Sequence, residues 1–117
     1  MAGLREAVQG LAARPDVDAV VLVSGDGLLI DHAGRESSDP EAIAALAASF
    51  SQGARRLGQA ARCDPLSAGV LEYGDRLAVI RALGSDNLLF ILSTKATNVG
   101  QLLFDLRRQG PALAALL

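Results

Sequence analysis

The sequence predicts an α+β fold, an α/β sandwich in which a five-stranded antiparallel sheet has helices on both faces. Three observations lead to this prediction. Apolar residues recur with the helical period in three segments and form short strand-like runs in five others. These segments follow one another in the order αββαβββα. The run RLAVIRAL at 76–83 is apolar on both of its sides, which is typical of a strand that is covered on two faces.

A short helix and a hairpin are predicted for the first third of the chain. Leu4, Val8 and Leu11 fall at i, i+4 and i+7, which predicts an amphipathic helix that RPD at 14–16 ends. Two apolar, β-branched runs then flank SGDG at 24–27, which has the composition of a tight hairpin turn. We therefore expect the first two strands to be adjacent and antiparallel.

The longest predicted helix begins near Pro40. Asp39 is placed to cap it, and Glu41 lies near the positive end of its dipole. It is expected to end around Arg62. Its large apolar face is expected to pack on the sheet of its own chain, and this face consists of Ile43, Leu46, Ala47, Phe50, Ala54, Leu57 and Ala61.

The same helix has a second face without charged residues in its first half, and the whole run AIAALAASFSQGA at 42–54 is uncharged. Small side chains allow another backbone to approach closely, and burial without charge avoids a desolvation penalty. A second copy of the helix is the simplest partner, because twofold dimers are the commonest oligomers. Burial of the helix wholly within its own domain is the alternative. The second face comprises Ala44, Ala45, Ala48, Ser51, Gln52, Arg55 and Gln59.

Three further strands and a helix are predicted for the remainder of the chain. The runs at 68–73, 76–83 and 87–93 are joined by short turns and indicate an antiparallel meander. TNVGQLLFDLRRQG at 97–110 has helical spacing and is expected to be capped by its threonine or its asparagine. The glycine and proline at 110–111 are expected to end or kink this helix. ALAALL then forms either a kinked last turn or an apolar tail packed elsewhere.

Composition limits the classes of function. A net charge of −2 and a pI near 5.2 disfavour nucleic acid as a partner, because phosphate recognition needs a concentrated basic face. No stretch approaches the ~20 apolar residues of a membrane span, so we expect no membrane insertion. With one cysteine and no secretion signal at the start, we expect a cytoplasmic protein with a single domain over 1–117. The mean hydropathy of +0.31 indicates that part of the surface is covered by another chain.

No catalytic, cofactor-binding or metal site is predicted. His32 is the only histidine, which leaves too few ligands for a metal cluster. Cys63 follows a helix C-terminus, the end of the dipole that does not favour a thiolate nucleophile. The SGDG run is followed by a strand and lacks the lysine of a phosphate-binding loop. Lys95, the sole lysine, is interpreted as a solvent-exposed residue, with a phosphate contact as the alternative.

Four stretches, taken in order and spacing, resemble the roadblock/dynein light-chain family over nearly the whole chain. They are VDAVVLVSGDGLLID, EAIAALAASFSQGARRLGQ, GVLEYGDRLAVIRALGSDNLLFILS and TNVGQLLFDLRR. The resemblance implies a roadblock-like αββαβββα fold that dimerises through the second helix and the third strand. It places Ala44, Ala45, Ala48, Ser51, Gln52, Val70, Leu71 and Glu72 at the dimer interface.

The resemblance also implies a function. Bacterial and archaeal proteins similar to this chain, the MglB-type regulators among them, act on small Ras-like GTPases. The chain would then be a non-catalytic homodimer that binds such a GTPase, with activation of hydrolysis as a further possibility that needs no arginine finger. The paired-helix surface would meet the GTPase through Gln52, Arg55, Arg56 and Gln59.

Two other interpretations stay open at this stage. The first is a structural adaptor of the dynein light-chain type, which would offer a sheet edge for strand addition and bind regardless of nucleotide. The second is a ligand-sensing domain, suggested only by the general arrangement of helices around an antiparallel sheet. The sequence does not identify the GTPase, or decide between a homodimer and a heterodimer.

Overall fold

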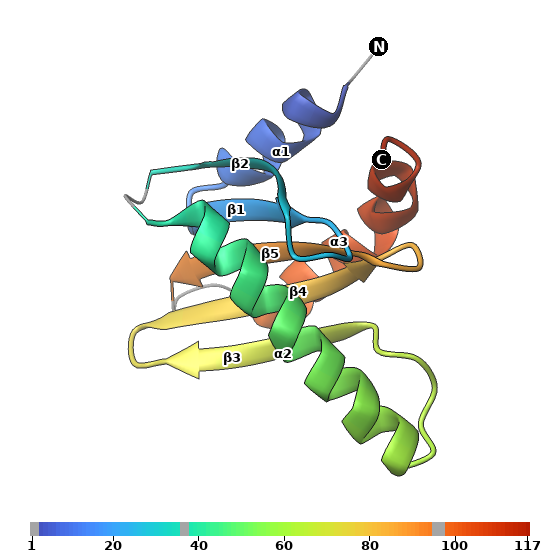
Figure 1. The fold of residues 1–117 in the computed structure, drawn as a ribbon. Helices are drawn as coiled ribbons and strands as arrows, with labels where there is room; N and C mark the ends of the chain where they lie inside the picture. The colour runs from blue at the N-terminus through green and yellow to red at the C-terminus, as the bar shows by residue number, and fades with distance from the viewer. Residues whose placement is uncertain (1–2, 36–37, 95–97) are drawn as a thin grey trace.

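The computed structural model describes residues 3–35, 38–94 and 98–117. Eight elements follow in the predicted order (Figure 1). The helices are α1 (Leu4–Ala12), α2 (Pro40–Ala60) and α3 (Val99–Ala114). The strands are β1 (Val17–Val23), β2 (Leu29–Gly34), β3 (Ala68–Tyr73), β4 (Arg76–Leu83) and β5 (Asn87–Thr94).

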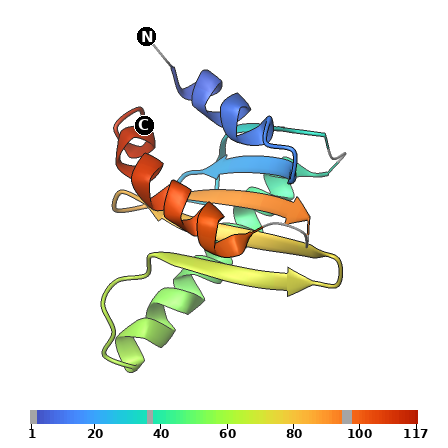
Figure 2. The same ribbon diagram turned by 180° about the vertical axis from the view of Figure 1, so that it is seen from behind.

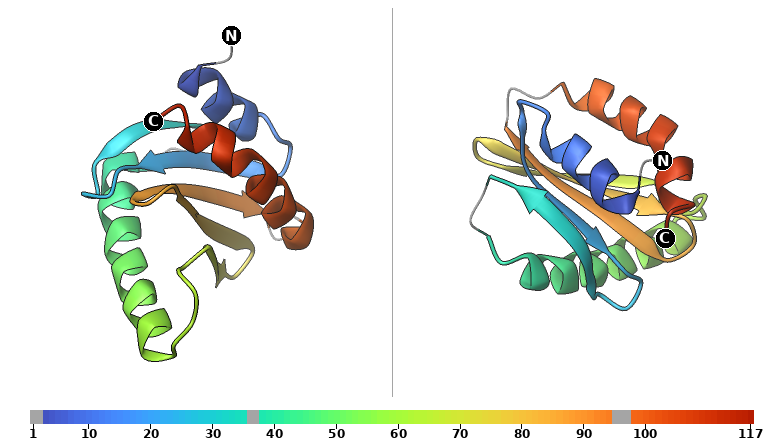
Figure 3. Two further views of the ribbon diagram at one scale, coloured as in Figure 1. Left: turned by 90° about the vertical axis from the view of Figure 1, so that its right-hand side faces the viewer. Right: turned by 90° about the horizontal axis from the view of Figure 1, so that it is seen from above.

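The five strands form one antiparallel sheet with the order β2-β1-β5-β4-β3. The predicted hairpin and meander are both present, and they are joined where β1 pairs with β5. Helix α2 covers one face of the sheet, while α1 and α3 cover the other (Figures 2 and 3). The predicted α+β sandwich with helices on both faces is therefore confirmed.

Each face of the sheet has its own core, because successive side chains of a strand point to opposite faces. Val20 and Leu22 of β1 belong to the core beneath α1 and α3. Val21 and Val23 of the same strand belong to the core beneath α2. This division explains why the central strands have continuous apolar runs rather than alternating ones.

Helix α2 turns its small residues, not its large ones, toward the sheet. Its buried residues are Ala44, Ala47, Ala48 and Ser51. Leu46 and Leu57 are 70% and 72% exposed, and Phe50 is 41% exposed. The prediction that the large apolar face of α2 packs on the sheet of its own chain is thus wrong for these three side chains. Ala47 is buried and Ile43 packs against the core, as expected.

The close approach of the β1–β2 turn explains this orientation. A Cβ atom placed on Gly27 would lie only 3.3 Å from the Cβ of Ala48 and 3.5 Å from the Cα of Ala45. Gly27 also has a φ of 82°, a conformation that glycine adopts without strain. Alanine and glycine are needed here because a larger side chain would push the helix off the sheet.

The predicted starts of α2 and α3 and the predicted end of α2 agree with the structure, and the predicted end of α3 does not. Asp39 accepts a hydrogen bond from the Ala42 N–H at 3.2 Å, and Asn98 accepts one from Gln101 N–H at 3.0 Å. Thr97, the alternative cap, and Lys95 lie outside the described residues. Helix α2 ends at Ala60, close to the expected end.

The end of α3 differs from the prediction. The helix continues through Pro111 to Ala114 instead of ending at the Gly110–Pro111 pair. Leu113 explains the continuation, since it is buried in the core beneath α1 and α3. ALAALL therefore begins as the last turn of the helix, and Leu116 and Leu117 follow with partly exposed side chains.

Enlarging the buried face of α2 should destabilise the fold. Ala44 has no exposed surface, so we expect Ala44→Leu to overpack the core and to lower the free energy of unfolding by about 1–3 kcal/mol. Ala42, exposed in the first turn of the same helix, provides the control: Ala42→Leu should change it by less than about 0.5 kcal/mol. Urea unfolding measures both. Equal effects would mean that Ala44 does not face the sheet.

Candidate protein-interaction site

The large side chains of α2 form an uncovered apolar surface beside β3. Figure 1 shows α2 crossing the sheet diagonally and its last turns passing beyond β3. Leu46, Phe50 and Leu57 follow one side of the helix and remain exposed. We call these three residues the apolar stripe. Their exposure makes this side of α2 a candidate interaction site, because exposed apolar patches often mark such sites on proteins.

A groove of about 350 Å³ lies between the apolar stripe and the sheet. The register places Gly69 opposite Ile80, whose side chain lies in the core beneath α2, so Leu71 and Tyr73 also point to this face. Phe50 lies over Gly69, with its ring edge 3.6 Å from the position of an added Cβ. No charged residue lines the groove, which is formed by Ile43, Leu46, Ala47, Phe50, Leu71, Tyr73, Ile80 and Phe90.

Strand β3 is an open sheet edge. In the described part of the chain it pairs with β4 alone, so the backbone groups along its outer side meet no further strand. Such an edge can add a strand from a partner through backbone hydrogen bonds. An open edge beside an apolar groove can therefore accept a strand and a helix together.

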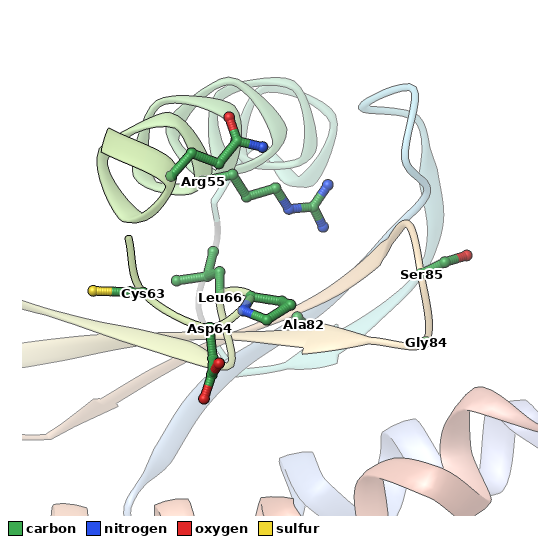
Figure 4. Close-up of a pocket in the computed structure, with 9 residues that line it drawn as sticks. Arg55, Cys63, Asp64, Leu66, Ala82, Gly84 and Ser85 are labelled. Carbon is green, nitrogen blue, oxygen red and sulfur yellow. The ribbon is translucent and has the colours of Figure 1, made fainter. Parts of the chain in front are cut away.

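A second cavity, of about 380 Å³, lies at the other end of α2 and contains two of the predicted contact residues (Figure 4). Arg55 and Gln59 line it from the helix. The loop after α2 contributes Cys63 and Asp64, and the β4–β5 turn contributes Ser85. The cavity thus places a cation and an amide from α2 beside an exposed carboxylate from the loop that follows the helix.

The Roadblock/LC7 domain model matches residues 4–93 of this sequence. The chain belongs to the Roadblock/LC7 family. The family predicted from the four sequence stretches is therefore confirmed. No curated protein matches the chain in sequence.

Solved roadblock structures share the fold. The Roadblock/LC7 domain from Streptomyces avermitilis superposes with a TM-score of 0.82 at 23% identity, covering 97% of this chain and 93% of that one. MglB of Myxococcus xanthus has a TM-score of 0.79 at 20% identity, with 86% and 82% covered. The gliding protein MglB from Thermus thermophilus has a TM-score of 0.82 at 15% identity, with 97% and 87% covered. At these identities the similarity establishes the fold.

The dimer-interface residues predicted for this roadblock chain divide into two groups. Ala44, Ala48 and Ser51 are buried against their own sheet, with at most 8% of each exposed, so within one chain they present little surface to a partner. The other predicted residues remain available. Ala45 and Gln52 are exposed on α2, Val70 and Glu72 are exposed on β3, and Leu71 lines the groove.

Sequence reasoning missed the exposure of the apolar stripe and the position of Tyr73 beside it in the groove. The periodicity found the stripe but assigned it to the interior. One signal could have corrected this: the β1–β2 turn is rich in glycine, and it can approach a helix closely only over alanine. The high mean hydropathy agrees with exposed leucine and phenylalanine.

The predicted GTPase contacts lie on the flank of α2 away from the apolar stripe. Gln52, Arg56 and Gln59 are exposed, and Arg55 is half-buried beside the cavity.

Among the described residues there is no group of three or more histidine, cysteine, aspartate or glutamate side chains that could hold a metal. His32 and Cys63 are exposed and far apart in the sequence. Within the described ranges no helix combines the length and apolar character of a membrane span.

Proposed function

We propose that this chain is a non-catalytic homodimeric regulator that binds a Ras-like small GTPase. The observation that carries the proposal is the apolar stripe of α2, which is left uncovered beside the open edge of β3. Membership of the roadblock family and the shared fold with MglB proteins support the choice of partner.

In the proposed dimer, a twofold axis pairs β3 with its copy and α2 with its copy. A twofold contact is self-complementary, so each apolar stripe meets the groove or the stripe of the other chain. Fully burying one leucine side chain contributes about 1.5–3 kcal/mol, and the stripe contains two leucines and a phenylalanine. Pairing of the β3 edges would also satisfy backbone groups that water otherwise hydrates.

The GTPase contact is assigned to Gln52, Arg55, Arg56 and Gln59. These side chains lie on the flank of α2 turned away from the stripe, so a dimer formed through the stripe and β3 leaves them accessible, and Gln52 is then assigned to the GTPase contact rather than to the dimer interface. Arginine and glutamine at an interface rim favour a partner with acidic and polar groups. The chemistry of hydrolysis would belong to the GTPase, with this dimer ordering the catalytic residues of its partner.

The dimer is tested by placing a charge on the apolar stripe. Because Leu46 is exposed within one chain, Leu46→Arg should leave the fold intact but bury an unpaired charge between two chains. We expect dimerisation to weaken by about 3 kcal/mol, or roughly a hundredfold in Kd, measured by light scattering across a dilution series.

The matched control is a second exposed leucine. Leu28 follows the β1–β2 turn, at the edge of the sheet opposite β3, so Leu28→Arg introduces the same charge away from the proposed interface. It should not change the dimer. A dimer mass that Leu46→Arg also leaves unchanged would overturn the interface.

The GTPase contact is tested by reversing a charge. Arg56→Glu should reduce affinity for the GTP-bound partner at least about tenfold while the dimer mass is unchanged. Arg108→Glu, on α3 at the opposite face, is the control. The partner is first captured from host lysate with GDP and with a non-hydrolysable GTP analogue, and its single-turnover hydrolysis rate is then measured with and without the dimer. If the Arg56→Glu variant captures the GTPase as well as the unchanged protein does, the contact lies elsewhere. If the dimer leaves the hydrolysis rate of the GTPase unchanged, the chain binds the GTPase without activating it.

A structural adaptor is the second candidate function, and the free edge of β2 favours it. In the described chain β2 pairs with β1 alone and presents Ile30 at the surface. That edge stays open when β3 is used for dimerisation. An adaptor would capture the same proteins with GDP and with the GTP analogue, and none of them would be a GTPase.

A further inference from the structure

A cavity of about 470 Å³ lies on the face opposite α2, between α3 and the end of β4. The C-terminal half of α3 runs beside the β4–β5 turn there (Figure 2), and the Cβ of Ala114 is 3.9 Å from the position of an added Cβ on Gly84. Two arginines, Arg81 of β4 and Arg107 of α3, line the cavity. The remaining lining residues are uncharged, and they are Ala82, Leu83, Gly84, Gly110, Pro111 and Ala114.

Arg81 is the unusual member of this pair. It interrupts the apolar strand β4, and its register opposite Leu89 places it on the same face as the core beneath α1 and α3. Its Nε atom is buried and has no hydrogen-bond partner in the described structure. A buried donor without an acceptor lowers stability, so such an atom is completed by water, by an ion or by a ligand group.

No described carboxylate balances the two guanidinium groups. The ion pairs of the described residues involve Arg5, Arg14 and Arg76, not Arg81 or Arg107. The acidic residue of α3, Asp105, lies on the other flank of the helix. There a hydrogen bond from Gln101 and the guanidinium of Arg14, 3.1 Å away, lower the pKa of Asp105. Asp105 is therefore occupied elsewhere.

The backbone offers an acceptor but no charge. Pro111 has no N–H, so the carbonyl of Arg107 lacks its usual helical partner. That oxygen could accept one donor, directly or through water, yet it would leave the positive charges of both arginines that line the cavity uncompensated. A carboxylate would balance one of them, whereas a phosphate group carries nearly two negative charges at pH 7 and has enough oxygens for two arginine forks.

We infer that the cavity between α3 and the end of β4 binds the phosphate group of a small soluble molecule through Arg81 and Arg107. The site is separate from the apolar stripe. It borders the cavity that contains the predicted GTPase contacts Arg55 and Gln59, since Ala82 and Gly84 line both cavities, but its two arginines are not among those contacts. It does not depend on the proposed function.

The first test observes the unpartnered atom itself by titrating ¹⁵N-labelled protein with inorganic phosphate. The Nε–Hε resonance of Arg81, assigned by its loss in Arg81→Gln, should shift and reach saturation at millimolar phosphate. The resonance of Arg62, an exposed residue beyond α2, should not follow that curve. Sodium chloride at equal ionic strength is the matched control. An Arg81 resonance that stays unchanged, or that shifts equally in chloride, would overturn the site.

The second test uses Arg107→Gln, a substitution at an exposed position that preserves the fold. Phosphate affinity from the same titration should fall at least about tenfold, because one of two charge-assisted contacts is lost. Acetate should bind more weakly than phosphate to the unchanged protein. A phosphate monoester such as glycerol phosphate separates two sources: tighter binding than inorganic phosphate indicates an organic phosphate, and equal binding indicates the free ion. Undiminished affinity in Arg107→Gln would refute the two-arginine site.

Discussion

The close packing of α2 on the sheet through alanine determines the rest of this structure. Ala44 and Ala48 let the helix backbone approach β1 and the β1–β2 turn, where an added Cβ on Gly27 would lie only 3.3 Å from the Cβ of Ala48. Only one face of a helix can pack against the sheet of its own chain. Once the small face is used there, the leucines and the phenylalanine must lie to the side.

That constraint makes the cores on the two faces of the sheet differ in composition. The core beneath α1 and α3 contains many of the larger buried side chains, such as Leu22, Leu102 and Leu106. The core beneath α2 is thinner and built partly from alanine. Its incomplete covering leaves the groove beside Phe50 and Tyr73. The α2 side therefore leaves large apolar side chains exposed, and the opposite side buries its larger side chains.

The order of elements and the sheet could be predicted because periodicity, caps and turn residues are local. Asp39 and Asn98 cap their helices through contacts within a few residues, so the sequence alone determines those ends. Which face of α2 turns inward could not be predicted this way. Periodicity gives the spacing of a stripe but not its direction, and the direction depended on Gly27, far from Ala48 in sequence. The passage of α3 through Pro111 likewise depended on the tertiary packing of Leu113.

The candidate sites show the same limit. Arg55 and Gln59 were identified from the helix alone, because they lie one turn apart. Tyr73 joined the groove only through the register of β3 on β4. Arg81 and Arg107 come from a strand and a helix that no local pattern connects, so only the folded chain brings them to one cavity.

The position of β5 has a consequence for how the chain folds during synthesis. This strand lies at the centre of the sheet, between β1 and β4, yet it is the last strand to leave the ribosome. Until then the chain contains two unconnected hairpins, and the inner edges of β1 and β4 have no neighbour. Ile91 pairs with Val20 on one side and Val79 on the other, so it closes both contacts in one step. Such non-local closure is slow and leaves apolar strand edges exposed to aggregation, which makes completion of β5 the step that commits the nascent chain to its fold.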